Sequence, residues 1–211
     1  MKILWTLVIL VSFTVSAICK DALSETDVAE LQEAGSNEDI LKEANKSFTY
    51  NSKPIHPGCV EQFMVNLADS GPPIVRAVDV ESCVSSNEFF MDYKVSEDGY
   101  IGYEYEDAGE KKYFGYKDIG KASGGLHILD TRASGGGTMV AMTVFLTRFG
   151  LENYRSFDQQ EKLTIEQRLI MKCIGQIDRG DRDIGSLELT NNNLVLGESQ
   201  YRKKVEVINL D

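Results

Sequence analysis

If this chain has a catalytic site, we expect it around His127, one of only two histidines. The residues that follow it include Asp130 and Ser134, so a base, a carboxylate that could orient it and a hydroxyl nucleophile occur in one short segment. These are the groups used by acyl-transfer hydrolases. Gly135–Gly137 come next, and the backbone N–H groups of such a run can hold an anion. The segment predicts a hydrolase-type site with His127, Asp130 and Ser134 as candidate catalytic residues and the three glycines as candidate binding residues.

The same segment also has a purely structural interpretation. A glycine run between two apolar strands is typical of a bulge or of a close crossing of strands. The chain has neither the Gly-x-Ser-x-Gly elbow of α/β-hydrolases nor a P-loop. We therefore interpret the protein first as a non-enzymatic binding or interaction domain, with the hydrolase as the alternative.

Tyrosines gather in the segment that we expect to supply a pair of β-hairpins. The candidate binding residues are Tyr103, Tyr105, Tyr113 and Tyr116. An exposed tyrosine offers a large flat surface with a polar tip, which suits contact with a ligand. A tyrosine packed inside a sheet is simply a good strand former. The sequence leaves both interpretations open.

The first residues have the pattern of an export signal. Lys2 precedes an apolar run over residues 3–15, and Val-Ser-Ala ends at Ala17, where we expect cleavage. The run is shorter than the roughly 20 residues of a membrane-spanning helix. Cys19 permits a lipid anchor as the alternative, although Ile18 is bulkier than the residue that usually precedes a lipidated cysteine. The chain is thus predicted to be exported, to the periplasm or beyond.

Export places the cysteines in a compartment that permits disulfides. Cys59 and Cys83 form the best pair, because one begins an expected helix and the other follows the strand that should pack against that helix. Such a disulfide also removes Cys59 as a thiol nucleophile beside His56. Cys173 lies in an apolar strand and is expected to be a buried free thiol.

The charge of the chain restricts its partners. The formal net charge is −11, which repels the phosphates of nucleic acid. A basic protein is permitted as a partner, for instance a basic secreted enzyme that this chain would inhibit, and an unknown protein or small ligand is equally compatible. No cofactor is predicted. Asp178, Asp181 and Asp183 could supply oxygen ligands to Ca²⁺, but they do not have EF-hand spacing and alternate with arginines.

The periodicity of the chain predicts a mainly β protein of the α+β class. Residues 1–17 are the signal peptide, residues 18–46 a polar tether that is partly disordered or helical, and residues 47–211 a single domain. Apolar residues at helical spacing predict one amphipathic helix over residues 57–70. Alternation from about residue 89 onward predicts about nine or ten strands in an antiparallel sandwich or a strongly curved sheet. The polar residues 150–167 are expected to form a surface loop.

The segment Lys53–Cys59, together with the glycine run before a long apolar strand, resembles uncharacterised exported bacterial proteins. The resemblance covers about residues 48–197. It implies a periplasmic, β-rich protein and brings with it no activity, cofactor or catalytic residue.

Overall fold

The computed structural model describes residues 37–64, 75–85, 92–157 and 162–211. The chain divides into two compact units, residues 1–39 and 40–211, and the second unit contains all of the described strands. The predicted signal peptide, its cleavage site and Cys19 lie outside the described residues. In the described part of the chain, no helix is both long and apolar enough to cross a membrane.

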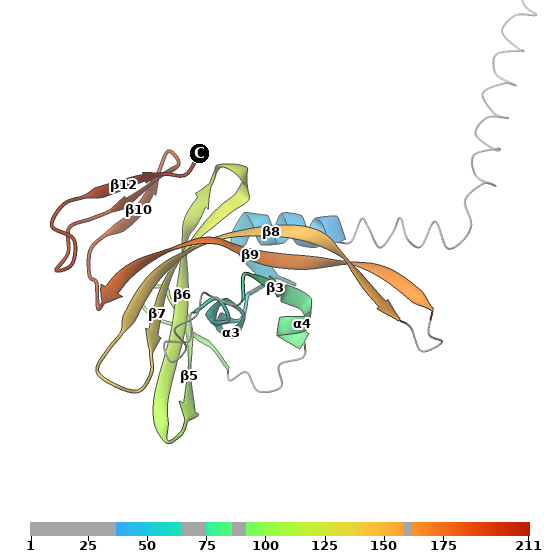
Figure 1. Cartoon of the computed structure of the whole chain (residues 1–211), viewed down its shortest axis with the longest axis horizontal. Coiled ribbons are helices and arrows are strands. Elements are labelled where there is room, and N and C mark those ends of the chain that lie inside the picture. The colour runs from blue at the N-terminus through green and yellow to red at the C-terminus, as the bar shows by residue number, and fades with distance from the viewer. Residues whose placement is uncertain (1–36, 65–74, 86–91, 158–161) are drawn as a thin grey trace, which may run out of the picture. The chain divides into compact units, whose positions relative to one another are not determined.

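Twelve strands in the described residues form three antiparallel sheets, so the predicted mainly β class is confirmed (Figure 1). The largest is a curled seven-stranded sheet with the order β3-β9-β8-β7-β6-β5-β4, which confirms the predicted strongly curved sheet. The C-terminal sheet has the order β10-β11-β12, and β1 pairs with β2. The strands are Thr49–Tyr50 (β1), Lys53–Pro54 (β2), Ala77–Asp79 (β3), Lys94–Val95 (β4), Ile101–Asp107 (β5), Glu110–Ala122 (β6), Leu126–Ser134 (β7), Ala141–Phe157 (β8), Leu163–Asp181 (β9), Leu187–Thr190 (β10), Asn193–Leu196 (β11) and Glu206–Asn209 (β12).

The two faces of the large sheet bury different clusters. We call face A the side that carries Phe145 and Phe149 of β8, which pack into a core completed by Phe48, Val60 and other residues of the N-terminal segments. Face B is the opposite side, where other β8 and β7 residues pack against the C-terminal sheet. Because successive side chains of a strand point to opposite faces, β8 is apolar on both sides over this stretch, as its sequence predicts. The face B cluster is Ala122, Leu126, Ile128, Val144, Leu194 and Leu196.

The expected helix over residues 57–70 is shorter than predicted. Helix α3 spans Pro57–Glu61, residues 62–64 form a turn, and residues 65–70 lie outside the described residues. Proline suits the first helical turn, and the His56 side chain accepts a hydrogen bond from Gly58 N at the helix start. The helix stops early although its apolar spacing continues, because Phe63 and Met64 turn into the core instead of extending along one helical face.

Two further helices were not expected. Helix α4 (Val80–Ser85) follows β3 directly, and Asp79 accepts hydrogen bonds from the backbone and the hydroxyl of Ser82 at its start. This is the usual role of aspartate at a helix N-terminus. A short 3₁₀ turn, η1 (Ser123–Gly125), connects β6 to β7. Residues 37–47 are helical, and all but the last of them belong to the predicted tether of residues 18–46.

The expectation of a surface loop over residues 150–167 was wrong. Strands β8 and β9 continue through most of it and pair from Leu151 opposite Leu169 out to Phe157 opposite Leu163. We call this outer ribbon, residues 151–157 with 163–169, the arm; it extends past the rest of the sheet (Figure 1). Polar residues are compatible with a strand here because the two strands pair with each other while most of their side chains stay in solvent.

Cys59 and Cys83 form the predicted disulfide, which joins α3 to the unexpected helix α4. The sequence separation is 24, and closing a loop of that size restricts the unfolded chain. The double variant Cys59→Ser with Cys83→Ser is expected to lose about 3 kcal/mol of unfolding free energy. Urea unfolding measures this, with Cys173→Ser as the matched single-thiol control. A loss no larger than that of the control would contradict a stabilising role.

Candidate functional site

His127 lies in the core on face A and is 1% exposed. Its Nδ1 is 3.2 Å from Asp118 Oδ2, and its Nε2 is 3.2 Å from the carbonyl oxygen of Asn45. The ring packs between Phe48 and Phe149. Both nitrogens therefore face acceptors inside the protein, and the imidazole fastens the N-terminal helix to the sheet.

The structure does not bring the three candidate catalytic residues together. His127 is paired with Thr147 and points to face A, whereas Asp130 is paired with Val144 and points to face B. Ser134 shares the face of Asp130 but is four residues further along the strand, about 13 Å away. The geometry thus gives no support to a hydrolase site built on these residues.

The glycine run forms part of the exposed connection between β7 and β8. Gly136 has a positive φ of 93°, and a Cβ there would come within 2.6 Å of Glu110 Cβ. Gly135 and Gly137 have open space around the position that a Cβ would occupy. The run acts as a hairpin loop, where only Gly136 needs to be glycine.

A buried ionic network occupies the middle of face B. Arg179 Nη1 donates to Asp130 Oδ1 at 2.8 Å, and the Tyr100 hydroxyl donates to Asp130 Oδ2 at 2.5 Å. Burial, reinforced by the hydrogen bond to this carboxylate, raises the pKa of Tyr100 well above its usual range. Asp130 is therefore a structural anchor for one tyrosine and one arginine.

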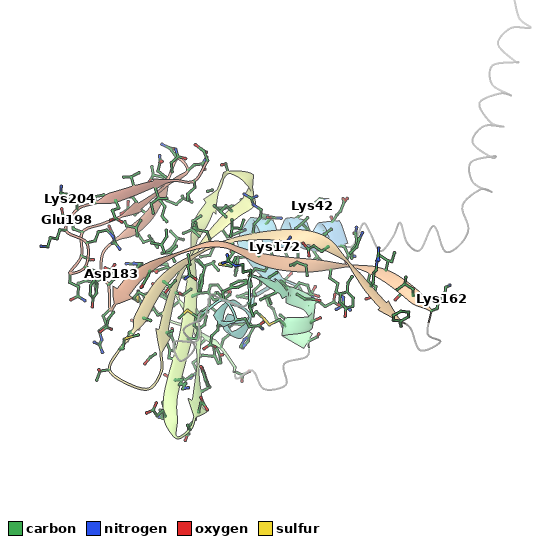
Figure 2. All side chains as sticks on the ribbon, viewed as in Figure 1. Lys42, Lys162, Lys172, Asp183, Glu198 and Lys204 are labelled. Atoms are coloured by element: carbon green, nitrogen blue, oxygen red, sulfur yellow. A yellow bond between two sulfur atoms is a disulfide. The ribbon has the colours of Figure 1, made fainter. Side chains whose placement is uncertain are left out.

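Arg179 also holds the segment that leads to the C-terminal sheet. Its Nη2 donates to the carbonyl oxygens of Asp183 and Gly185, and its Nε is 3.5 Å from Asp183 Oδ2. Arg202 Nη2 lies 3.2 Å from the same Asp183 oxygen. Figure 2 shows Asp183 where the chain leaves β9 for this sheet. The network thus joins the large sheet to the connection on its face B.

Two bulges in β9 place Arg179 in that network. Leu169, Met171 and Cys173 belong to face A, but Ile174 is an extra residue without a partner in β8, so Ile177 faces B. Arg179 is a second extra residue, between the partners of Thr143 and Met142. Bulges redirect side chains in this way, and no local pattern in the sequence announces them.

The three aspartates considered as calcium ligands bind different groups. Asp178 accepts from Gly180 N, Asp181 accepts from Val140 N, and Asp183 is held by arginines and by Gly185 N. The described residues contain no group of three or more His, Cys, Asp or Glu side chains placed to hold a metal ion.

The candidate binding tyrosines divide between the two faces. Tyr103 and Tyr105 stack on face A and both donate to the carboxylate of Glu61. Burial and this hydrogen bond raise the pKa of Tyr105 to about 12. Tyr116 is buried and donates to the Ile55 carbonyl oxygen at 2.6 Å. These three stabilise the core, although Tyr103 also borders the groove that Tyr113 lines, and Tyr113 alone of the four lies on face B.

Tyr113 borders a groove on face B with a volume of about 580 Å³. Its ring lies across Gly102 and Gly115, which are paired, and a Cβ on either glycine would come within 2.5 or 2.3 Å of its hydroxyl. The polar groove residues Asp92, Lys94, Ser96 and Glu104 were not among the predicted site residues. The sequence did contain a signal for the groove, because Gly102 and Gly115 both occur in the tyrosine-rich segment. Only the strand register, however, places the two glycines opposite each other.

The arm carries a second feature that sequence reasoning missed. Leu163, Ile165 and Phe157 are 50%, 58% and 73% exposed. The pairing places them on the same side as Leu151 and Leu169, so this side carries an exposed apolar cluster at the tip of the arm. Asn153, Gln167 and Arg155 lie on the same side, between this cluster and the core. The opposite side is polar apart from Tyr154, whose ring lies under the Arg168 guanidinium.

No protein-family model, no curated protein and no solved structure matches the chain. The function must therefore be inferred from the groove, the arm and the charges.

Asp130→Asn is expected to lower the free energy of unfolding by about 3 kcal/mol, because it leaves part of a buried arginine uncompensated. Asp107→Asn, at the exposed Lys112–Asp107 pair, is the matched control and is expected to change stability little. The double variant Asp130→Leu with Arg179→Met should lose less than the sum of its single variants. Additive losses in urea unfolding would show that the pair is not coupled.

The environment of the Asp183 carboxyl group predicts that the stability of the protein depends on pH. Burial alone would raise its pKa, but the Gly185 N–H and the charges of Arg179 and Arg202 outweigh it and hold the pKa below its usual range. A depressed pKa in the folded state stabilises the fold above the unfolded value of about 3.9, and this is lost as pH falls through the folded value. When the pH is lowered from about 5 to about 2, the unfolding free energy of the wild-type protein should fall by more than that of the Asp183→Asn variant. Parallel stability curves would contradict this role.

Proposed function

We propose that this chain is an exported, non-enzymatic binding domain that engages a partner protein through its arm. The observation that carries the proposal is the solvent-exposed apolar cluster of Phe157, Leu163 and Ile165, which lies beside Arg155 on one side of the arm. Soluble proteins seldom leave such a cluster uncovered unless it contacts something.

The backbone of the arm indicates the kind of partner. Pairing of β8 with β7 ends at Arg148, and pairing of β9 with β3 begins at Ile170. Within the described residues, no strand adds to the outer edges of the arm beyond these points. Unpaired edges accept another strand through backbone hydrogen bonds. We commit to an extended segment of a partner protein, with apolar side chains at alternate positions facing Phe157 and Ile165.

The rest of the chain agrees with a binding role. His127 is held in the core on the face opposite Asp130, which removes the base from the most plausible catalytic set. The Cys59–Cys83 disulfide is compatible with export, and the apolar run of residues 3–15 supports it. A periplasmic location belongs to this proposal.

An acidic inhibitor of a basic secreted enzyme is the second candidate. The net charge of −11 favours it, since opposite charge speeds association with a basic protein. Salt separates the two candidates. Contact through the apolar arm should be almost independent of ionic strength, whereas a charge-driven complex should weaken steeply as salt screens it.

The arm proposal is tested with a photoreactive phenylalanine analogue at position 157, introduced into the full-length protein in its producing cell. We expect a defined adduct with another protein, because the side chain at this position is 73% exposed on the apolar face. The same analogue at Ile184, which is 92% exposed outside the arm, is the matched control and should give no such adduct.

The captured protein, once identified and purified, should protect the amides of residues 149–157 from hydrogen exchange. Phe157→Ser with Ile165→Ser should weaken its binding by about tenfold or more, since buried aromatic anchors dominate interfaces. Ile184→Ser should leave binding unchanged. An adduct of twice the chain mass, or equal labelling from position 184, would contradict a separate partner at the arm.

A further inference from the structure

The groove beside Tyr113 is distinct from the arm. It lies on face B over β4, β5 and β6, in a part of that face not covered by the C-terminal sheet cluster. Its volume of about 580 Å³ falls within the range of about 300–1,000 Å³ that is usual for small-molecule sites. A ligand with one or a few rings would fit.

The floor of the groove is an aromatic ring held in place by the backbone. Gly102 and Gly115 leave the space that the Tyr113 ring occupies, and any side chain there would collide with it. The hydroxyl end of the ring lies over the two glycines, and Tyr113 also lines the groove. Tyr100 also lines the groove and is fixed by Asp130 and by Arg132, whose guanidinium lies 3.6 Å from the Tyr100 ring centre.

Positively and negatively charged side chains lie beside the Tyr113 ring. Lys94 is paired with Gly102, and Glu104 with Tyr113, so both side chains are on face B beside the ring. Asp92 also lines the groove. For these three exposed side chains, the structure shows no ion pair or hydrogen bond within the described residues. They are free to bind a ligand.

From this arrangement we infer that the groove binds a neutral carbohydrate, with a sugar ring stacked on Tyr113 and its hydroxyls bonded to Lys94, Glu104 and Asp92. A sugar presents an apolar C–H face to an aromatic ring, while each hydroxyl at its rim both donates and accepts. Charged groups strengthen such bonds. Two carboxylates beside one ammonium disfavour phosphorylated or acidic ligands, and the ammonium disfavours cations.

The inference is tested with purified mature protein and four soluble probes: cellotetraose, chitotetraose, maltotetraose and the cation benzyltrimethylammonium. Saturation-transfer NMR should show that the C–H protons of at least one tetrasaccharide contact the protein, and calorimetry should give its affinity. Sedimentation with cellulose and chitin distinguishes a polymer surface from a free oligosaccharide as the source of the sugar. Binding of either form supports the inference.

The variants separate stacking from general damage. Tyr113→Ala should weaken binding by about tenfold, and Tyr113→Phe, which keeps the ring, should retain most of it. Glu104→Gln, at an exposed position that does not threaten folding, should weaken it several-fold. Tyr201→Ala, at a tyrosine that is 55% exposed outside the groove, is the control and should have no effect.

Three results would overturn the inference. One is the absence of binding of every saccharide and polymer at millimolar concentration. Another is tighter binding of the cation than of any saccharide, which would make the groove a cation–π site. The third is unchanged saccharide binding in both Tyr113→Ala and Glu104→Gln. The arm variants Phe157→Ser and Ile165→Ser leave the groove intact and should bind saccharide normally. Failure of the saccharide inference can therefore be distinguished from failure of the arm proposal.

Discussion

The antiparallel pairing of β8 with β9 is the constraint on which the rest of this structure depends. The two strands have 17 and 19 residues and stay paired from Ala141 opposite Asp181 to Phe157 opposite Leu163. Their inner half supplies apolar side chains to both faces, so the N-terminal segments can pack on face A and the C-terminal sheet on face B. Of their outer half, the arm, only Leu151 and Leu169 reach the core, and the cluster of Phe157, Leu163 and Ile165 at its tip is exposed.

The buried charges on face B decide how that face is used. An ion pair removed from water contributes little net stability but is costly to break, so it favours one arrangement over others. Here Arg179 joins Asp130 of the large sheet to Asp183, at the start of the connection to the C-terminal sheet. The C-terminal sheet covers one region of face B, and the region beside Tyr113 stays open as a groove.

The two proposed binding features belong to the same sheet, but each would bind its ligand through a different kind of interaction. In the part of the chain that the structure describes, the arm offers unpaired backbone edges and an exposed apolar cluster, which suit an extended protein segment. The groove offers one fixed aromatic ring surrounded by charged side chains, which suits a small hydroxylated ligand. Neither involves His127, because its ring is enclosed between Phe48 and Phe149 and bonded on both nitrogens.

The sequence by itself determined the class of the fold and the two-sided burial of β8, because alternation is a local signal. It predicted the Cys59–Cys83 disulfide from export and from the expected packing of a helix against a strand, and the tertiary structure confirmed that pairing. It predicted the start of α3 but not its end, and it took the polar outer half of β8–β9 for a loop. It placed His127, Asp130 and Ser134 near one another along the chain. On a strand, the alternation of side chains already sends His127 and Asp130 to opposite faces, and only the tertiary structure decided that both would be buried, His127 in the aromatic core and Asp130 against Arg179. The bulges at Ile174 and Arg179, the glycine pair under Tyr113 and the exposed face of the arm depend on register between distant strands, which no local pattern encodes.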